Sequence, residues 1–202
     1  VIEHRQFHIE QVREMFKSLD IFIFTLGLTE SWMHRPSGTV FPIAPGTQAG
    51  RFNPRKHKFY NANFKQIKND MNQFLSITNE IRGGKPFKML LTVSPVPLTA
   101  TASNAHVLVA TMQSKALLRS AAAELCSRNL NIDYFPSYEI VNNPRLNSLS
   151  FADNLRTIRP EIVATVMRHF FEVTGAEHKK QSLPIATPSL DSCKIEDVQC
   201  EE

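Results

Sequence analysis

The chain has 202 residues, of which 42% are hydrophobic and 21% charged, and its net charge is +4. This composition supports one domain with a sizeable core and argues against a disordered chain, and no apolar run approaches the roughly 20 residues of a membrane span. No basic segment followed by an apolar run opens the chain, so no secretory signal is predicted. Three cysteines, an odd number, favour a reducing compartment, and we expect a cytoplasmic protein.

The first third of the chain predicts a helix, a strand and a long loop. Apolar residues at three- and four-residue spacing predict an amphipathic helix over Phe7–Leu19, with one face formed by Ile9, Val12, Phe16 and Leu19. The run IFIFTL at residues 21–26 ends at Gly27 and predicts a strand buried on both faces. Residues 31–61 are rich in Pro and Gly, so we expect a functional or partly mobile loop there.

The remainder alternates between helices and short strands. A helix is predicted over Asn63–Arg82, a buried strand over Phe87–Val93, and a long helix, capped by Ser103 or Asn104, up to Ser127. A third strand is predicted over 131–135. Pro160 suits the first turn of a last helix, whose expected inward residues are Val163, Val166, Met167 and Phe170.

Alternating helices and strands build a parallel sheet with helices on both faces, so we predict a three-layer α/β/α domain over residues 1–175. Three strands make a small sheet, and no strand precedes the first helix. We therefore expect one or two N-terminal strands outside this chain. Residues 176–202 are acidic and aperiodic and predict a flexible tail.

The basic residues concentrate between Arg51 and Lys88, where nine Lys and Arg accompany only Asp70 and Glu80. Such a run attracts anionic polymers, but aromatic residues that would stack on bases are sparse there. We favour a solvated face over a nucleic-acid interface, and we expect neither nucleic acid nor membrane as a partner.

Ligands of open α/β sheets bind beyond the carboxyl ends of the strands, which selects residues 27–32, 94–104 and 136–139. In the first segment, Thr29, Glu30, Ser31 and Trp32 follow a glycine that permits close backbone approach. This cluster suits an acyl group or a sugar. The alternative is that the hydroxyls cap a turn and the indole packs over the sheet.

The second segment brings His106 near the start of the long helix, where the helix dipole favours neutral imidazole. This environment suits a base, although many such histidines are plain surface or core residues. We expect Ser114 and Lys115 to serve helix packing rather than to form a nucleophile pair. GxGxxG, GxxxxGK[ST], HExxH, paired CxxC and GxSxG motifs do not occur, so we predict no cofactor and no metal.

Five phrases of the sequence resemble the GSCFA family, a group related to the SGNH (GDSL-like) hydrolases: IFTLGLTESW, LLTVSPVPLTAT, HVLVAT, SKALLR and YFPSYEIV. The similarity covers roughly Ile9–Val173. It implies a flavodoxin-like α/β/α sandwich and ester or acyl chemistry on a carbohydrate or another small acylated substrate.

The resemblance also implies site residues. The Gly-Ser-Cys-Phe-Ala signature with the presumed serine nucleophile does not occur in these 202 residues, and we expect it upstream. The GxND block of SGNH hydrolases resembles residues 27–30, which implies Gly27 and Thr29 as oxyanion or substrate contacts and Glu30 as an orienting carboxylate. The DxxH block resembles residues 153–156. Arg156 stands in place of the base; an Arg cannot take a proton from serine, but its fork suits an anionic group.

The implied function is an acyl-ester hydrolase or acyltransferase that uses a serine nucleophile. His106 is the replacement base that we favour, and His34 is the next candidate. The expected substrate contacts are Ser31, Trp32, His34, Ser94 and Arg156. The alternative is a glycan or polysaccharide-precursor binding module that does not cleave its ligand. Without the serine, we expect no turnover by this chain.

Overall fold

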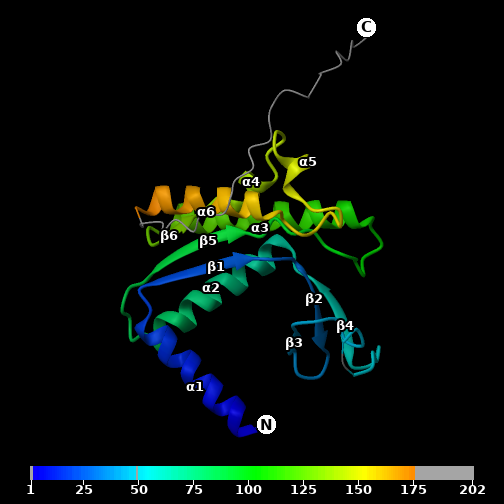
Figure 1. Cartoon of the computed structure of the whole chain (residues 1–202). Coiled ribbons are helices and arrows are strands. Elements are labelled where there is room, and N and C mark those ends of the chain that lie inside the picture. The colour runs from blue at the N-terminus through cyan, green and yellow to red at the C-terminus, as the bar shows by residue number, and fades with distance from the viewer. Residues whose placement is uncertain (1, 49, 176–202) are drawn as a thin grey trace, which may run out of the picture.

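The structure is a computed structural model that describes residues 2–48 and 50–175 (Figure 1). Its main sheet has three parallel strands in the order β1-β5-β6. These are β1 (Ile21–Leu26), β5 (Lys88–Val93) and β6 (Ile132–Tyr134). A second, smaller sheet is antiparallel, in the order β3-β2-β4, and consists of β2 (Glu30–His34), β3 (Val40–Phe41) and β4 (His57–Asn61).

Helices cover the main sheet on two faces, which confirms the predicted three-layer α/β/α architecture. The connections from β1 to β5 and from β5 to β6 advance in one direction, and right-handed crossovers then place their helices on the same face. These helices, α2 (Phe64–Ile81) and α3 (Val107–Arg128), lie side by side and share an ion pair of 3.0 Å between Lys68 and Glu124.

The other face of the sheet is covered by α4 (Ser137–Val141) and α6 (Pro160–Thr174), while α5 (Asn147–Ser150) lies between them in the chain. Ser137 contacts Thr92 of β5 with an oxygen–oxygen distance of 2.5 Å, and the ring of Phe170 packs 5.3 Å from that of Phe135. The first helix, α1 (Ile2–Ser18), packs against α2 through Phe16 and Phe74, with 5.9 Å between ring centroids.

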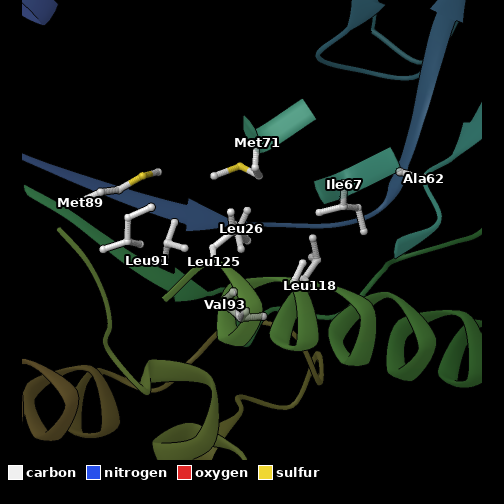
Figure 2. Close-up of a cluster of buried hydrophobic side chains, with 12 residues drawn as sticks. Leu26, Ala62, Ile67, Met71, Met89, Leu91, Val93, Leu118 and Leu125 are labelled. Carbon is white, nitrogen blue, oxygen red and sulfur yellow. The ribbon is translucent and has the colours of Figure 1, made fainter. Parts of the chain in front are cut away.

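The core fills the space between β5 and the α2/α3 layer (Figure 2). Alternate side chains of one strand face one side of a sheet, and Met89, Leu91 and Val93 are at most 1% exposed. They meet a face of α3 whose apolar residues recur every three or four positions: Leu118, Ala121, Ala122 and Leu125. This layer fixes the amino ends of α2 and α3 at the carboxyl ends of the strands.

The prediction that residues 21–26 are buried on both faces is wrong. Leu26 is 6% exposed on the α2 side, but Ile21 and Ile23 on the opposite face are 60% and 54% exposed. The reason is topological, because β1 is an outer strand of the sheet and α4 and α6 cover the part built by β5 and β6.

The segment 31–61 is not only a loop, since it contains the antiparallel sheet of β2, β3 and β4. Cross-strand residue pairs between β2 and β4 include Trp32 with Phe59 and His34 with His57.

Several details of the helices also differ from the prediction. His106, rather than Ser103 or Asn104, caps α3, and in α6 the buried residue is Ile162, whereas Val163 and Met167 are 47% and 38% exposed.

The predicted acidic tail, residues 176–202, lies outside the described residues. So do Cys193 and Cys200, while Cys126 is half-buried against the core and its burial raises the pKa of its thiol. No helix of the described part of the chain is long and apolar enough to cross a bilayer.

Candidate functional site

The carboxyl ends of β1 and β5 lie side by side, because Leu26 pairs with Val93 and the Ser94 N–H donates to the Leu26 carbonyl oxygen at 2.9 Å. We call the loops beyond these ends the carboxyl rim. It comprises residues 27–30, 94–106 and 152–159, together with Ser114 and Lys115 of α3. Three of its four parts contain residues predicted from the sequence, and the structure ties these parts together by hydrogen bonds.

Gly27 opens the rim. A Cβ built on this residue would meet nothing within 4 Å, and the residue is exposed. A ligand can therefore approach the backbone closely at this point, as expected from the sequence.

Thr29 is only 5% exposed and is anchored through its backbone. Its N–H donates to Ser114 Oγ at 2.8 Å, and its carbonyl oxygen accepts from the Ala62 N–H at 2.9 Å. The Thr29 N–H is thus occupied and does not serve as an oxyanion donor. Its hydroxyl has no hydrogen-bond partner within the described residues, so the side chain is the group that a ligand can use.

Glu30 joins the exit of β1 to the exit of β5. The Thr101 hydroxyl donates to Glu30 Oε1 at 2.6 Å, and Thr101 Oγ1 lies 2.7 Å from Ser103 Oγ. This contact fixes the carboxylate at the rim.

Lys115 is the deepest charge at the rim. Its side chain is 1% exposed and its Nζ donates to the Gly27 carbonyl oxygen at 2.8 Å. Burial and, to a smaller extent, the charge of Arg156 lower the pKa of Lys115 from its ordinary value of 10.5 to about 8.

Arg156 reaches the rim from the loop before α6. Its Nη1 donates to the Pro97 carbonyl oxygen at 2.9 Å and also contacts the Thr99 hydroxyl. The preceding Leu155 has a φ of 54°, a strained left-handed value for a large side chain. Asn154 Oδ1 accepts from the Arg156 N–H at 3.0 Å and closes this turn.

His106 is exposed and caps α3, with its Nδ1 accepting from the Leu108 N–H at 3.3 Å. Within residues 2–48 and 50–175, no hydrogen bond or ion pair joins its ring to the other rim residues. Ser94 Oγ accepts from the Val96 N–H at 3.2 Å and shapes the exit of β5.

The remaining predicted contacts lie on the small sheet rather than at the rim. Trp32 packs against Phe52 and Phe59 at ring distances of 5.3 and 5.6 Å. His34 lies four residues beyond Glu30, roughly 13 Å at the usual rise per residue of a strand, and its Nδ1 is 2.8 Å from Ser37 Oγ. Ser31 is half-buried on β2, opposite Tyr60.

These contacts form a polar cluster at the carboxyl end of the main sheet. The model of the GSCFA family matches residues 1–170. The chain belongs to the GSCFA family. No curated protein and no solved structure matches it significantly.

Sequence reasoning assigned Ser114 and Lys115 to helix packing and did not consider Thr111, so it missed the part of the candidate site that lies on α3. Thr111, Ser114 and Lys115 are 9%, 1% and 1% exposed, so they form a buried polar stripe. A signal existed in the sequence, because these positions continue the apolar face of Leu118, Ala122 and Leu125 at helical spacing. Polar side chains on such a face are buried, so they must form hydrogen bonds with other parts of the protein.

The third predicted segment, residues 136–139, forms a separate network in this GSCFA domain. Arg119 Nε donates to Glu139 at 2.6 Å, and the Tyr134 hydroxyl donates to the other oxygen of that carboxylate at 2.8 Å. Burial raises the pKa of Tyr134, and Glu139 raises it further. The network ties α3, β6 and α4 together, which is a structural role.

The basic run does not form one continuous surface. Arg82 is 6% exposed and donates to the carbonyl oxygens of Phe16, Lys85 and Pro86, and Lys68 is paired with Glu124. No cluster of three or more His, Cys, Asp or Glu residues suited to a metal ion occurs in the described part of the GSCFA domain.

Proposed function

We propose that this GSCFA protein is an SGNH-like acyl-ester hydrolase or acyltransferase that acts on an acylated carbohydrate or a small ester. In this proposal the chain supplies the substrate-binding rim. The serine nucleophile comes from a Gly-Ser-Cys-Phe-Ala segment upstream, because the signature does not occur in these 202 residues.

The opening at Gly27 is the observation that carries the proposal. The space beside its backbone lies at the carboxyl end of β1, and Thr29, two residues further along the chain, has a hydroxyl without a hydrogen-bond partner in the described residues. Donors placed around such an opening stabilise the oxyanion of acyl transfer. We assign the Gly27 backbone and the Thr29 hydroxyl to the acyl group, and Glu30, held by Thr101, to its orientation.

His106 is the imidazole that we assign to proton transfer. Because Nδ1 accepts the Leu108 N–H, a neutral ring in this arrangement holds its proton on Nε2 and cannot accept another there. The imidazolium that forms once the ring has taken the serine proton then donates that proton to the leaving alkoxide. To take a proton from serine through Nε2, the ring must release Leu108. Release of the cap thus accompanies the base step.

A serine-directed fluorophosphonate probe tests the reaction class. We expect covalent labelling of the longer protein that contains the signature, and none of the 202-residue chain. Labelling of the 202-residue chain, or its absence in the longer protein, would contradict the assignment of the nucleophile.

A pair of variants at position 106 separates catalysis from capping. Asn is a strong N-cap, so His106→Asn is expected to keep the stability of α3, whereas His106→Ala loses about 1 kcal/mol. Both variants are expected to reduce the esterase turnover of the longer protein by about 10²-fold or more, the usual contribution of a positioned acid or base. Unchanged turnover in His106→Asn would remove His106 from the mechanism.

A non-catalytic glycan-binding module is the second candidate. One observation favours it: Arg156, at the position that resembles the base of SGNH hydrolases, is held by the Pro97 carbonyl oxygen and cannot act as a base. This function predicts binding of an O-acetylated oligosaccharide by the longer protein without probe labelling and without release of acetate.

A further inference from the structure

Two cations of the carboxyl rim have no carboxylate partner. The ion pairs of the described residues, 2–48 and 50–175, involve other side chains, and neither Lys115 nor Arg156 takes part in one. A buried ammonium group is costly unless a counter-charge or hydrogen bonds stabilise it. Lys115 is 1% exposed, and among the described residues the Gly27 carbonyl oxygen is the single hydrogen-bond partner of its ammonium group.

The two cations are both connected to Pro97 and Leu98, in the loop after β5. Thr111 and Lys115 lie one helical turn apart on α3, and Thr111 Oγ1 accepts from the Leu98 N–H at 3.2 Å. Arg156 donates to the carbonyl oxygen of Pro97, the residue before Leu98. The charge of Arg156 contributes to the lowered pKa of Lys115, which is consistent with two like charges in proximity.

Both cations retain unused donors. An ammonium group has three N–H donors, and within the described residues the Lys115 Nζ uses one of them, in its hydrogen bond to the Gly27 carbonyl oxygen. Arg156 uses Nη1 only, so its Nε and Nη2 edge has no partner within the described residues. This edge is the fork that binds carboxylate or phosphate through two parallel hydrogen bonds.

Negative charge near the pair is limited. Residues 94–106 contain no acidic side chain. Asp153 lies 3.7 Å from Arg159, and Glu30 is bound by the Thr101 hydroxyl. The carboxyl rim thus holds three basic side chains, Lys115, Arg156 and Arg159, against two acidic ones, Glu30 and Asp153.

We propose that Lys115 and Arg156 bind an anionic group of the substrate, a carboxylate or a phosphate, beside Gly27. The inference rests on the proposed function and specifies its substrate class: an acylated carbohydrate that bears an acidic group. Arg156, in the loop before α6, donates hydrogen bonds to the anion. The Lys115 ammonium, at the Gly27 carbonyl oxygen, balances its negative charge.

A titration of the 202-residue chain tests this site without the nucleophile. The probes are acetate and inorganic phosphate, with acetamide as the neutral counterpart of acetate, and the readouts are the NMR shifts of the Gly27 amide and of the Lys115 side chain. We expect saturable shifts with at least one anion and none with acetamide. A bound anion favours the charged amine, so the pKa of Lys115 should rise.

Two arginine variants complete the test. Arg156→Gln should weaken binding about tenfold or more, as expected for loss of a charge-assisted fork. Arg168→Gln, an exposed residue two turns into α6, removes the same charge and should leave binding unchanged. Equal effects of the two variants, or no saturable shift with either anion, would overturn the proposal.

Two further ligands distinguish the source of the anion. Glucuronate presents a carboxylate and glucose 1-phosphate presents a phosphate, and the tighter binder identifies the acidic group. Anion binding measured on this chain stands even if the longer protein shows no esterase activity, which would refute the proposed function alone. Conversely, an active enzyme with no anion site would refute the inference alone.

Discussion

Lys115 shows how one residue determines the character of the rim. Its ammonium is held at the Gly27 carbonyl oxygen with the side chain 1% exposed, so folding removes a charged group from water. The free-energy cost of burying the charge lowers the pKa of Lys115. A buried charged residue at the carboxyl end of a sheet is therefore a candidate functional residue.

The lowered pKa predicts how stability depends on pH. Between about pH 8 and 10.5 the unfolded chain binds a proton at Lys115 that the folded chain does not, so this residue makes the free energy of unfolding rise with pH. Over this whole pH range, the titration of Lys115 raises the free energy of unfolding by about 3 kcal/mol. We expect Lys115→Met to lose this rise in urea denaturation measured at pH 8 and pH 10. The buried tyrosines remain in both proteins, so their titration cancels in the difference. Identical slopes in the two proteins would show that Lys115 titrates normally.

The strained residue beside Arg156 gives a second prediction at this scale. Leu155 has a φ of 54° and is 76% exposed, so its side chain contributes little packing. Asn tolerates left-handed backbone better than Leu, whereas a β-branched residue tolerates it worse. Leu155→Asn should therefore match or exceed the native melting temperature, and Leu155→Val should lose about 1 kcal/mol or more. The reverse order would contradict the left-handed turn.

At the scale of elements, α3 links the core to the site. Its carboxyl-terminal half packs on the sheet with apolar residues, and its amino-terminal half presents Thr111, Ser114 and Lys115 to the rim loops. One helix thus fixes the exits of β1 and β5 at the same time.

Ser114 tests this linkage. Ser114→Ala leaves the Thr29 N–H without its partner, and an unsatisfied buried donor costs about 1–3 kcal/mol. Ser120→Ala is the matched control, because Ser120 lies on the exposed side of the same helix. Thermal or chemical denaturation should separate the two variants. Equal stability would mean that water replaces Ser114 at the Thr29 N–H.

Periodicity predicted the elements that pack on the core. The spacing of Ile67 and Met71 located α2, and the run from 88 to 93 located β5, because burial on one face leaves a regular apolar pattern. The small sheet gave no such pattern. In β2 the alternation of Glu30, Trp32 and His34 with Ser31 and Met33 does not separate polar from apolar side chains, and prolines interrupt the flanking segments.

Part of the candidate site was also predictable, because the positions of the strand ends could be predicted from the sequence. The rule that ligands bind beyond strand ends selected residues 27–30 and the exit of β5, and the fold brings both to the rim. Contacts between distant segments were not predictable, since only the three-dimensional packing joins Ser114 to Thr29 or Arg156 to Pro97. Lys115 was assigned to helix packing, and its contact with the Gly27 carbonyl oxygen was missed because it joins residues 88 positions apart in the sequence.

At the scale of the whole molecule, the main sheet is covered unevenly. The α2/α3 layer buries one face completely at β5, whereas Ile21 and Ile23 of β1 are exposed on the other face. The outer edge of β1 has no strand partner within the described residues. An exposed apolar edge strand promotes association between chains.

This feature predicts concentration-dependent association of the 202-residue chain. Ile23→Lys places a charge on the exposed face of β1 and should reduce association in analytical ultracentrifugation without loss of secondary structure. Leu130→Lys is the control, because Leu130 is 103% exposed in the turn before β6 and lies outside that face. An equal decrease in both variants would point to net charge rather than to the strand.

The most direct measurement of the central claim is an NMR titration of the 202-residue chain with an O-acetylated uronic acid. The account predicts that amide shifts concentrate at residues 27–30, 98–101 and 156, and that Gly27→Ala, which adds a Cβ to open space, weakens binding while the melting temperature is retained. Shifts confined to other parts of the molecule, or none at saturating ligand, would contradict it.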